Sequence, residues 1–178
     1  MRLSVIKPIF LLVLVLITSS SVLANLEVGD KAPNFILNDQ NNEAHQLSDY
    51  EGRWVILYFY PKDDTPGCTT QACDFRDDMA RLTSEGYQVF GVSKDSVKSH
   101  ENFIDKQDIN FPLLMDEDGS IHEAFGTWRT KMNYGREYMG CARSSLVIGV
   151  DGKLVFARYN VKAKGHVGML MRELGIDE

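Results

Sequence analysis

The residues of this sequence best suited to redox or nucleophilic chemistry are its three cysteines, Cys68, Cys73 and Cys141. Cys68 directly follows a turn-rich segment that runs from Pro61 to Gly67 (PKDDTPG). The two prolines of this segment fix the backbone φ angle, and Gly67 lacks a Cβ where a ligand could approach the backbone. The segment is therefore typical of a specialised turn that presents the thiol of Cys68.

Cys68 is also expected to stand at the beginning of a helix. A helix over residues 68 to about 84 is predicted by four apolar residues at helical spacing, Ala72, Phe75, Met79 and Leu82. With about 100° of rotation per residue, Cys68 falls on the same apolar stripe and is expected to face the core. The free N–H groups and the positive dipole end of a helix N-terminus stabilise a thiolate at such a position.

Cys73 lies on a different side of this predicted helix. Five residues after Cys68, it is about 140° further round and roughly 7.5 Å further along the axis. A disulfide needs Cα atoms about 4.4–6.8 Å apart and side chains that face each other. Cys68 and Cys73 therefore cannot bond while the helix is intact, and its first turn must unwind if they are to pair.

The element that leads into the turn is a predicted strand over residues 53–60 (RWVILYFY). The other predicted elements are strands over residues 87–93, 111–115, 144–150 and 154–159, and helices over residues 97–107, 119–125 and 165–174. Asp151-Gly152 between the last two strands is a hairpin signal. Strands that alternate with helices and end in a hairpin predict an α/β domain over residues 25–178. We expect a thioredoxin-like fold with a mixed central sheet and helices on both faces.

Length and composition fit one globular domain of ordinary soluble type, with 178 residues, 44% of them hydrophobic and 25% charged. The formal net charge is -6, and it becomes -8 if the two positive charges of Arg2 and Lys7 are removed with the first 24 residues. An acidic surface disfavours nucleic acid and anionic membranes as partners.

Residues 1–24 are expected to be a signal peptide. Arg2 and Lys7 supply the positive start, residues 9–17 (IFLLVLVLI) are an unbroken apolar run, and Val22-Leu23-Ala24 offers a cleavage site. An uncleaved membrane anchor is the alternative, but a bilayer span needs about 20 apolar residues. We therefore expect an exported, periplasmic protein with no stable membrane association after cleavage. In an exported chain, an odd number of cysteines indicates a free or reactive thiol.

The segment Pro61-Lys-Asp-Asp-Thr65-Pro-Gly-Cys68-Thr-Thr-Gln-Ala-Cys73 closely resembles the peroxiredoxins, and best of all the Q type, the bacterioferritin comigratory proteins. The family pattern of Pro, three residues, Thr, two residues and Cys is matched by Pro61, Thr65 and Cys68. The resemblance runs from Val28 to Ile148, which is nearly the whole chain after the signal segment.

This resemblance implies a thiol peroxidase that reduces hydrogen peroxide and organic hydroperoxides. Cys68 would be the peroxidatic thiolate that becomes a sulfenic acid, and Cys73 would resolve it as an intramolecular disulfide. A thioredoxin-like reductant would then recycle the enzyme, although an exported protein is out of reach of cytosolic thioredoxin. The active-site Arg of the family matches Arg143, with Arg76 and Arg129 as lesser candidates. We expect a monomer that needs no cofactor and no metal.

Thiolate formation alone is not enough for a fast peroxidase, because the nucleophilicity of a thiol falls as the thiol becomes more acidic. Such an enzyme must also activate the peroxide, by hydrogen-bond donors aimed at the oxygens where charge develops. The groups expected to do this are Thr65, the backbone N–H groups of Gly67 and Cys68, and Arg143. Cys141, two residues before Arg143, is expected to be a buried thiol.

Other functions on the same fold are less consistent with the cysteine spacing. A thioredoxin-type disulfide reductase requires Cys-x-x-Cys, whereas four residues separate Cys68 from Cys73. A copper-binding module of the Sco type requires Cys-x-x-x-Cys with a downstream His. The four histidines have no metal-binding spacing and are expected to be structural or on the surface; they are His45, His100, His122 and His166. The acidic run from Asp116 to Gly119 lacks the further ligands of a calcium loop and predicts a turn.

Overall fold

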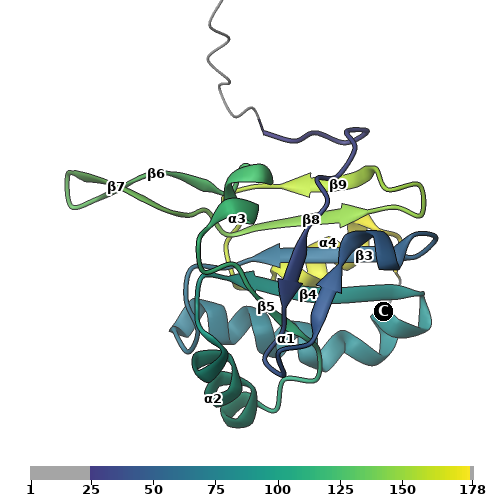
Figure 1. The fold of residues 1–178 in the computed structure, drawn as a ribbon, viewed down its shortest axis with the longest axis horizontal. Helices are drawn as coiled ribbons and strands as arrows, with labels where there is room; N and C mark the ends of the chain where they lie inside the picture. Colours follow the sequence, from purple (N-terminus) through teal and green to yellow (C-terminus); the bar gives the residue numbers. More distant parts are fainter. Residues whose placement is uncertain (1–24, 177–178) are drawn as a thin grey trace, which may run out of the picture.

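A five-stranded mixed sheet forms the centre of the protein (Figure 1). The computed structural model describes residues 25–176. The strand order is β5-β4-β3-β8-β9. Their bounds are Trp54–Phe59 for β3, Tyr87–Ser93 for β4, Leu113–Met115 for β5, Ser144–Ile148 for β8 and Leu154–Arg158 for β9.

Strand direction decides which loops meet at one edge of this sheet. Strands β3, β4 and β5 are parallel, whereas β8 is antiparallel to β3 and β9 is antiparallel to β8. The register places Phe59, the last residue of β3, opposite Ser144, the first residue of β8. The loop that follows β3 and the residues that precede β8 therefore lie at the same edge of the sheet.

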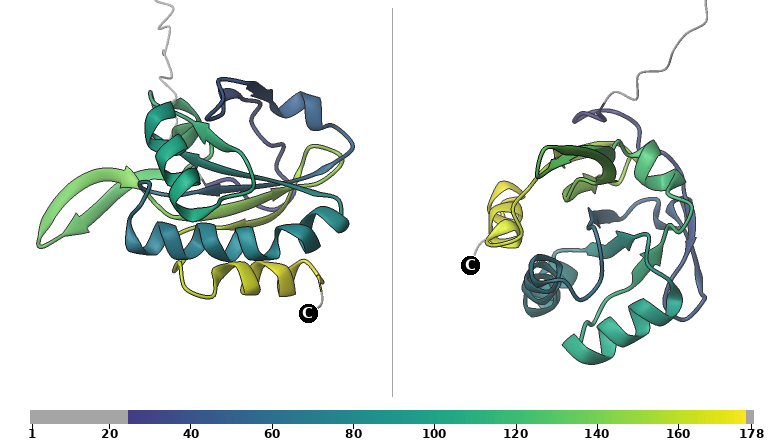
Figure 2. Two further views of the ribbon diagram at one scale, coloured as in Figure 1. Left: turned by 90° about the horizontal axis from the view of Figure 1, so that it is seen from below. Right: turned by 90° about the vertical axis from the view of Figure 1, so that its left-hand side faces the viewer.

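Helices cover both faces of the sheet, as predicted (Figure 2). Helices α1 (Pro66–Ser84) and α4 (His166–Glu173) pack side by side on one face, and the short α3 (Ser120–Ala124) lies on the other. Helix α2 (Val97–Gln107) reaches the apolar cluster of α1 and α4 through Phe103. The predicted thioredoxin-like α/β fold is confirmed.

Two antiparallel ribbons were not predicted. The first joins β1 (Ile36–Asn38) and β2 (Ala44–Gln46), and a 3-10 turn, η1 (Leu47–Tyr50), follows it.

The second ribbon joins β6 (Trp128–Asn133) to β7 (Arg136–Cys141) and projects from the body of the molecule (Figure 1). Its two-residue turn has positive φ at both positions, 47° at Tyr134 and 77° at Gly135. Such a turn usually carries Asn or Gly at its first position, and the tyrosine there hid the hairpin signal.

The predicted signal segment, residues 1–24, lies outside the described residues. Between residues 25 and 176, no helix has both the length and the apolar character needed to cross a bilayer.

Candidate active site

Cys68 lies in the first turn of α1, at the sheet edge where β3 ends and β8 begins. The helix starts at Pro66, two residues before the predicted start, which suits proline because the first helical N–H needs no partner within the helix. The N–H of Thr69 donates to the carbonyl of Thr65 over 2.8 Å and closes this turn. The Cys68 side chain is 1% exposed and packs among the apolar residues of α1, including Ala72 and Phe75, as the helical spacing predicted.

The Arg143 guanidinium meets the thiol of Cys68 across this edge. Nη2 of Arg143 donates to Sγ of Cys68 over 3.2 Å. Arg143 immediately precedes β8, and its carbonyl accepts a hydrogen bond from the N–H of Val161 over 2.9 Å. A Cβ at Gly67 would lie 3.3 Å from Nη2 of Arg143 and 3.6 Å from Cβ of Ala163. The missing side chain at Gly67 thus leaves room for the guanidinium beside Cys68.

Gln71 is a site residue that the sequence analysis missed. Its Oε1 accepts a hydrogen bond from Nη1 of Arg143 over 2.5 Å. The side chain is fully buried, and its Nε2 has no hydrogen-bond partner among the described residues. Gln71 lies three residues after Cys68, so both project from the same face of α1. A polar residue on an otherwise apolar helical stripe was the available signal.

Thr65 and Pro61 belong to the loop between β3 and α1. The hydroxyl of Thr65 donates to the carbonyl of Lys62 over 3.0 Å. Its proton is thereby engaged, and the oxygen keeps its lone pairs to accept a hydrogen bond from a peroxide. Pro61 is exposed and follows the last buried residue of the strand segment, Tyr60. Its contribution is the fixed φ angle at the start of the loop.

A buried carboxylate anchors the same loop to the rest of the fold. Oδ1 of Asp63 accepts from the hydroxyl of Tyr60 over 2.7 Å, and Oδ2 lies 2.9 Å from Nδ1 of His100 on α2. The backbone N–H of Asp63 donates to Oδ2 of Asp95 over 2.9 Å. Burial, together with the nearby Tyr58 and Asp63, raises the pKa of Tyr60 well above its usual value, so the phenol stays a donor. Three contacts of Asp63, with Tyr60, His100 and Asp95, therefore fix the loop that carries Thr65.

Cys73 and the two lesser arginine candidates lie away from the Cys68 thiol. Cys73 is half-buried, with Sγ 3.9 Å from Oε1 of Gln107. Arg76 pairs with Asp77 and also donates to the carbonyl of Gln107. Arg129 donates to the carbonyl of Gly126 and lies over the ring of Tyr159. Of the three arginines considered, Arg143 is therefore the one that contacts Cys68.

All three cysteines are free thiols, and α1 is continuous through both Cys68 and Cys73. Cys141 is 4% exposed, and burial raises its pKa to about 12. It remains a neutral thiol at physiological pH, in agreement with its prediction as a buried residue.

Each histidine has a side-chain partner: His45 contacts Asp39 and Tyr50, His100 contacts Asp63, His122 contacts Asp116, and His166 contacts Ser145. The carboxylate of Asp116 also accepts from the N–H groups of Ile121 and His122, which ties the acidic run to α3. Within residues 25–176, no group of three or more His, Cys, Asp or Glu side chains is arranged to hold a metal ion.

Known proteins are similar to this chain in both sequence and fold. The model of the AhpC/TSA family matches residues 28–157. Peroxiredoxin Bcp of Bacillus subtilis is 44% identical over 149 residues, which cover 84% of this chain and 95% of that protein.

Solved structures extend the similarity. The bacterioferritin comigratory protein of Xanthomonas campestris, described with alkyl peroxide reduction activity, gives a TM-score of 0.77 at 36% identity, covering 84% of this chain and 96% of its own. A PrxQ mutant of Xylella fastidiosa gives a TM-score of 0.81 at 35% identity, covering 85% and 97%.

Proposed function

This chain belongs to the AhpC/TSA family and is a peroxiredoxin of the Bcp/PrxQ type, and from that premise we propose that it reduces hydroperoxides through a thiolate at Cys68. The family implies thiol peroxidase activity. The observation that supports Cys68 as the reacting residue is its 3.2 Å contact with Nη2 of Arg143, which stabilises a negative charge on sulfur. Hydrogen peroxide and organic hydroperoxides are the proposed substrates, and alkyl peroxide reduction by the Xanthomonas relative supports the second class.

The first step is attack of the Cys68 thiolate on the terminal oxygen of the peroxide. The O–O bond breaks, the sulfur becomes a sulfenic acid, and the other oxygen leaves as an alcohol, or as water, after taking up a proton. Arg143 and the N–H groups at the start of α1 face the charge that develops on the oxygens. The hydroxyl of Thr65, whose own proton is engaged by Lys62, accepts the proton of the peroxide O–H in a hydrogen bond.

The second step is attack of the Cys73 thiol on the sulfenic acid of Cys68, which releases water and forms a disulfide. Because α1 is continuous through both residues, this step requires its first turns to unwind. A dithiol protein of thioredoxin type then reduces the disulfide by two electrons and leaves as a disulfide itself. No cofactor is needed, because the peroxide and the dithiol carry all the electrons that are exchanged.

We also propose that the protein acts as a monomer in the periplasm after export. The support for export is the apolar run at residues 9–17 and the small residues that end at Ala24. Mass measurement of the protein recovered from a periplasmic fraction tests this proposal, and an N-terminus at Asn25 is the expected result.

Cysteine variants test the assignment of the two thiols. Cys68→Ser should abolish peroxide reduction. Cys73→Ser should consume one peroxide per chain and stop as a sulfenic acid, which mass spectrometry detects. Cys141→Ser is the matched control and should keep full turnover with dithiothreitol. Rapid single-turnover reaction in Cys68→Ser would show that the roles are assigned wrongly.

A further inference from the structure

The ribbon of β6 and β7, called here the arm, stands apart from the domain. Its strands pair with each other and with none of the other described strands, and it extends beyond the sheet edge that carries the active site (Figures 1 and 2). An isolated two-stranded hairpin is at best marginally stable in water. The arm is firmly tied only at its base, where the N–H of Ala142 donates to the carbonyl of Thr127 over 2.7 Å and Nζ of Lys94 lies 4.9 Å from the centre of the Trp128 ring.

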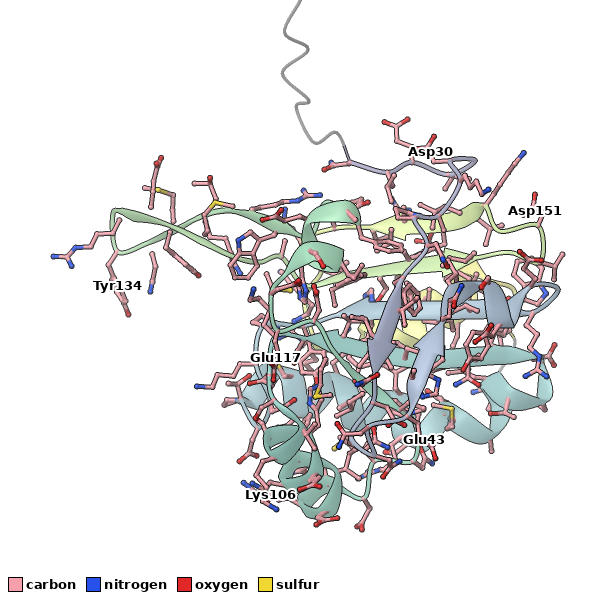
Figure 3. All side chains as sticks on the ribbon, in the orientation of Figure 1. Asp30, Glu43, Lys106, Glu117, Tyr134 and Asp151 are labelled. Carbon is pink, nitrogen blue, oxygen red and sulfur yellow. The ribbon has the colours of Figure 1, made fainter. Side chains whose placement is uncertain are left out.

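Large apolar side chains are exposed along the arm. The exposed fractions are 63% for Met132, 100% for Tyr134, 46% for Tyr138 and 52% for Met139. Figure 3 shows Tyr134 near the tip of the arm, with its side chain projecting from the ribbon. Methionine and tyrosine are typical of protein interfaces, because methionine adapts to different surfaces and tyrosine combines an apolar ring with a polar end.

The two faces of the arm differ in character. In the register of the ribbon, Thr130 pairs with Met139 and Met132 with Glu137, so both methionines project from one face. The hydroxyl of Thr130 lies 3.5 Å from Sδ of Met139, as expected for side chains on that face. The other face carries the cations and the second tyrosine, namely Arg129, Lys131, Arg136 and Tyr138.

The arm also belongs to the most basic part of an acidic chain. Residues 126–165 contain eight Lys or Arg and two Asp or Glu, whereas the whole chain has a net charge of -6. This segment includes Arg143 and the exposed Lys162 and Lys164, which follow β9 at the same sheet edge as the active site. Between the two lysines, Ala163 approaches Gly67 beside Cys68. An acidic partner would therefore be attracted to the side of the protein where the chemistry takes place.

The arm leads directly into the active site. Strand β7 ends at Cys141, two residues before Arg143, whose Nη2 contacts Cys68. A partner held on the arm is thus held close to the residues that form the proposed disulfide.

We infer that the arm is the docking surface for the protein that reduces the Cys68–Cys73 disulfide, and that this partner has acidic groups around its dithiol. The inference rests on the proposed function, because it requires the disulfide. In the docked complex, one partner thiolate attacks a sulfur of the disulfide, which forms a mixed disulfide and releases the other sulfur as a thiol. The second partner thiol then breaks the mixed disulfide, so that two electrons reach the enzyme and the partner leaves oxidised.

The experiment measures how well two different reductants support peroxide turnover by the wild type, an arm variant and a control variant. Met132→Ser with Arg136→Glu changes one residue on each face of the arm. The matched control is Ile36→Ser with Lys153→Glu, because Ile36 is also 63% exposed and Lys153 is an exposed cation that precedes β9, at the sheet edge opposite the active site. The probes are dithiothreitol, which needs no docking surface, and a thioredoxin of net negative charge.

With thioredoxin, the arm variant should show a KM for the reductant raised about ten-fold, and high salt should shrink the difference. With dithiothreitol it should turn over like the wild-type enzyme, and the control variant should match the wild type with both reductants. A thioredoxin with the carboxylates around its dithiol changed to amides should serve the wild-type enzyme less well than its parent.

Three kinetic results would each overturn the docking inference: an unchanged KM for thioredoxin in the arm variant, an equal loss with dithiothreitol, or no preference of the wild type for the acidic thioredoxin. A second copy of this chain could bind the arm in place of the reductant, and analytical sedimentation tests this alternative. A wild-type dimer that the arm variant converts to a monomer would also overturn it. Failure of the proposed function looks different, because no enzyme form would then turn over peroxide even with dithiothreitol.

Discussion

The Arg143 guanidinium is held from its far side by Gln71. Nη1 of Arg143 donates to Oε1 of Gln71 over 2.5 Å, while Nη2 donates to Sγ of Cys68 over 3.2 Å. One planar group thus joins the thiol to a buried amide on the same helix. Because a guanidinium holds its N–H donors in one rigid plane, a hydrogen bond that fixes one nitrogen also fixes the direction of the other. Gln71 therefore determines where the charge of Arg143 is placed.

Arg143→Ala should slow the reaction of the reduced enzyme with peroxide by about 100-fold, because one lost donor at a developing charge costs a factor of 10²–10³. Gln71→Met leaves this donor in place but no longer fixes its direction, so it should slow the same reaction by about ten-fold. Stopped-flow tryptophan fluorescence with hydrogen peroxide measures both rates.

The stability of Gln71→Met separates this effect from unfolding. The substitution also removes the buried Nε2, which has no partner among the described residues. The midpoint of urea unfolding should therefore stay the same or rise. Gln71→Glu, which keeps an acceptor oxygen toward Arg143, is the control and should retain more of the rate than Gln71→Met. A wild-type rate in Gln71→Met would refute the positioning role.

Local sequence pattern was enough to predict how Cys68 is presented. Helical spacing put Cys68 on the buried face of α1, and strand and helix boundaries elsewhere were close to those observed. Gln71 and the bond between Asp63 and His100 were missed because they depend on contacts between elements. The arm was missed because its turn begins with a tyrosine in a positive-φ conformation and because its strands, exposed on both faces, lack the alternation of a half-buried strand.

His100 is predicted to stabilise the loop that carries Thr65. His100→Leu should leave the carboxylate of Asp63, which is 6% exposed, without one of its partners. The expected cost is about 1–3 kcal/mol in the free energy of unfolding, which is typical when a buried polar group loses a hydrogen bond. Lys106→Ala is the control, since it removes the exposed ion pair with Asp64 in the same loop. This control should cost less than about 1 kcal/mol.

Urea unfolding of both variants measures these costs. Equal losses in His100→Leu and Lys106→Ala would show that the buried contact holds the loop no better than the exposed ion pair.

His166 is predicted to make the protein less stable in acid. Burial, with Arg143 nearby, lowers the pKa of His166 to about 4. The unfolded chain keeps the ordinary value of about 6.5. Between these values the unfolded chain binds a proton that the folded protein does not, so the free energy of unfolding should fall by about 3 kcal/mol as the pH drops from 6.5 to 4.

His166→Gln should flatten this dependence, because glutamine does not titrate. Ser145→Ala is the matched control: it removes the 2.7 Å contact to Nε2 but keeps the imidazole, so it should lower stability at every pH and preserve the slope. Urea unfolding at pH steps from 4 to 7 measures both. The same slope in His166→Gln and the wild type would assign the acid sensitivity to other groups.

The start of α1 is predicted to unwind when Cys68 and Cys73 form a disulfide. The reduced helix begins at Pro66 and holds the two thiols on different sides, so oxidation must release residues 66–74 while the strands stay in place. Amide hydrogen exchange of the reduced and oxidised forms measures this. Equal protection of residues 69–74 in both forms, with the disulfide confirmed by mass spectrometry, would contradict unwinding.

A stiffer helix start should make the enzyme easier to inactivate. The hydroxyl of Thr70 donates to the carbonyl of Pro66 over 3.0 Å, a local bond that does not favour the helix. Thr69→Ala with Thr70→Ala replaces two weak helix formers by the best one and should slow unwinding. The sulfenic acid of Cys68 then waits longer, and a second peroxide drives it to the sulfinic acid. Thr83→Ala, in the last turn of α1, is the control for a general gain in helix stability. Activity is followed at rising peroxide concentration, and it should fall at a lower concentration in the double variant than in the wild type or the control. Equal resistance of all three proteins to peroxide would show that unwinding does not limit disulfide formation.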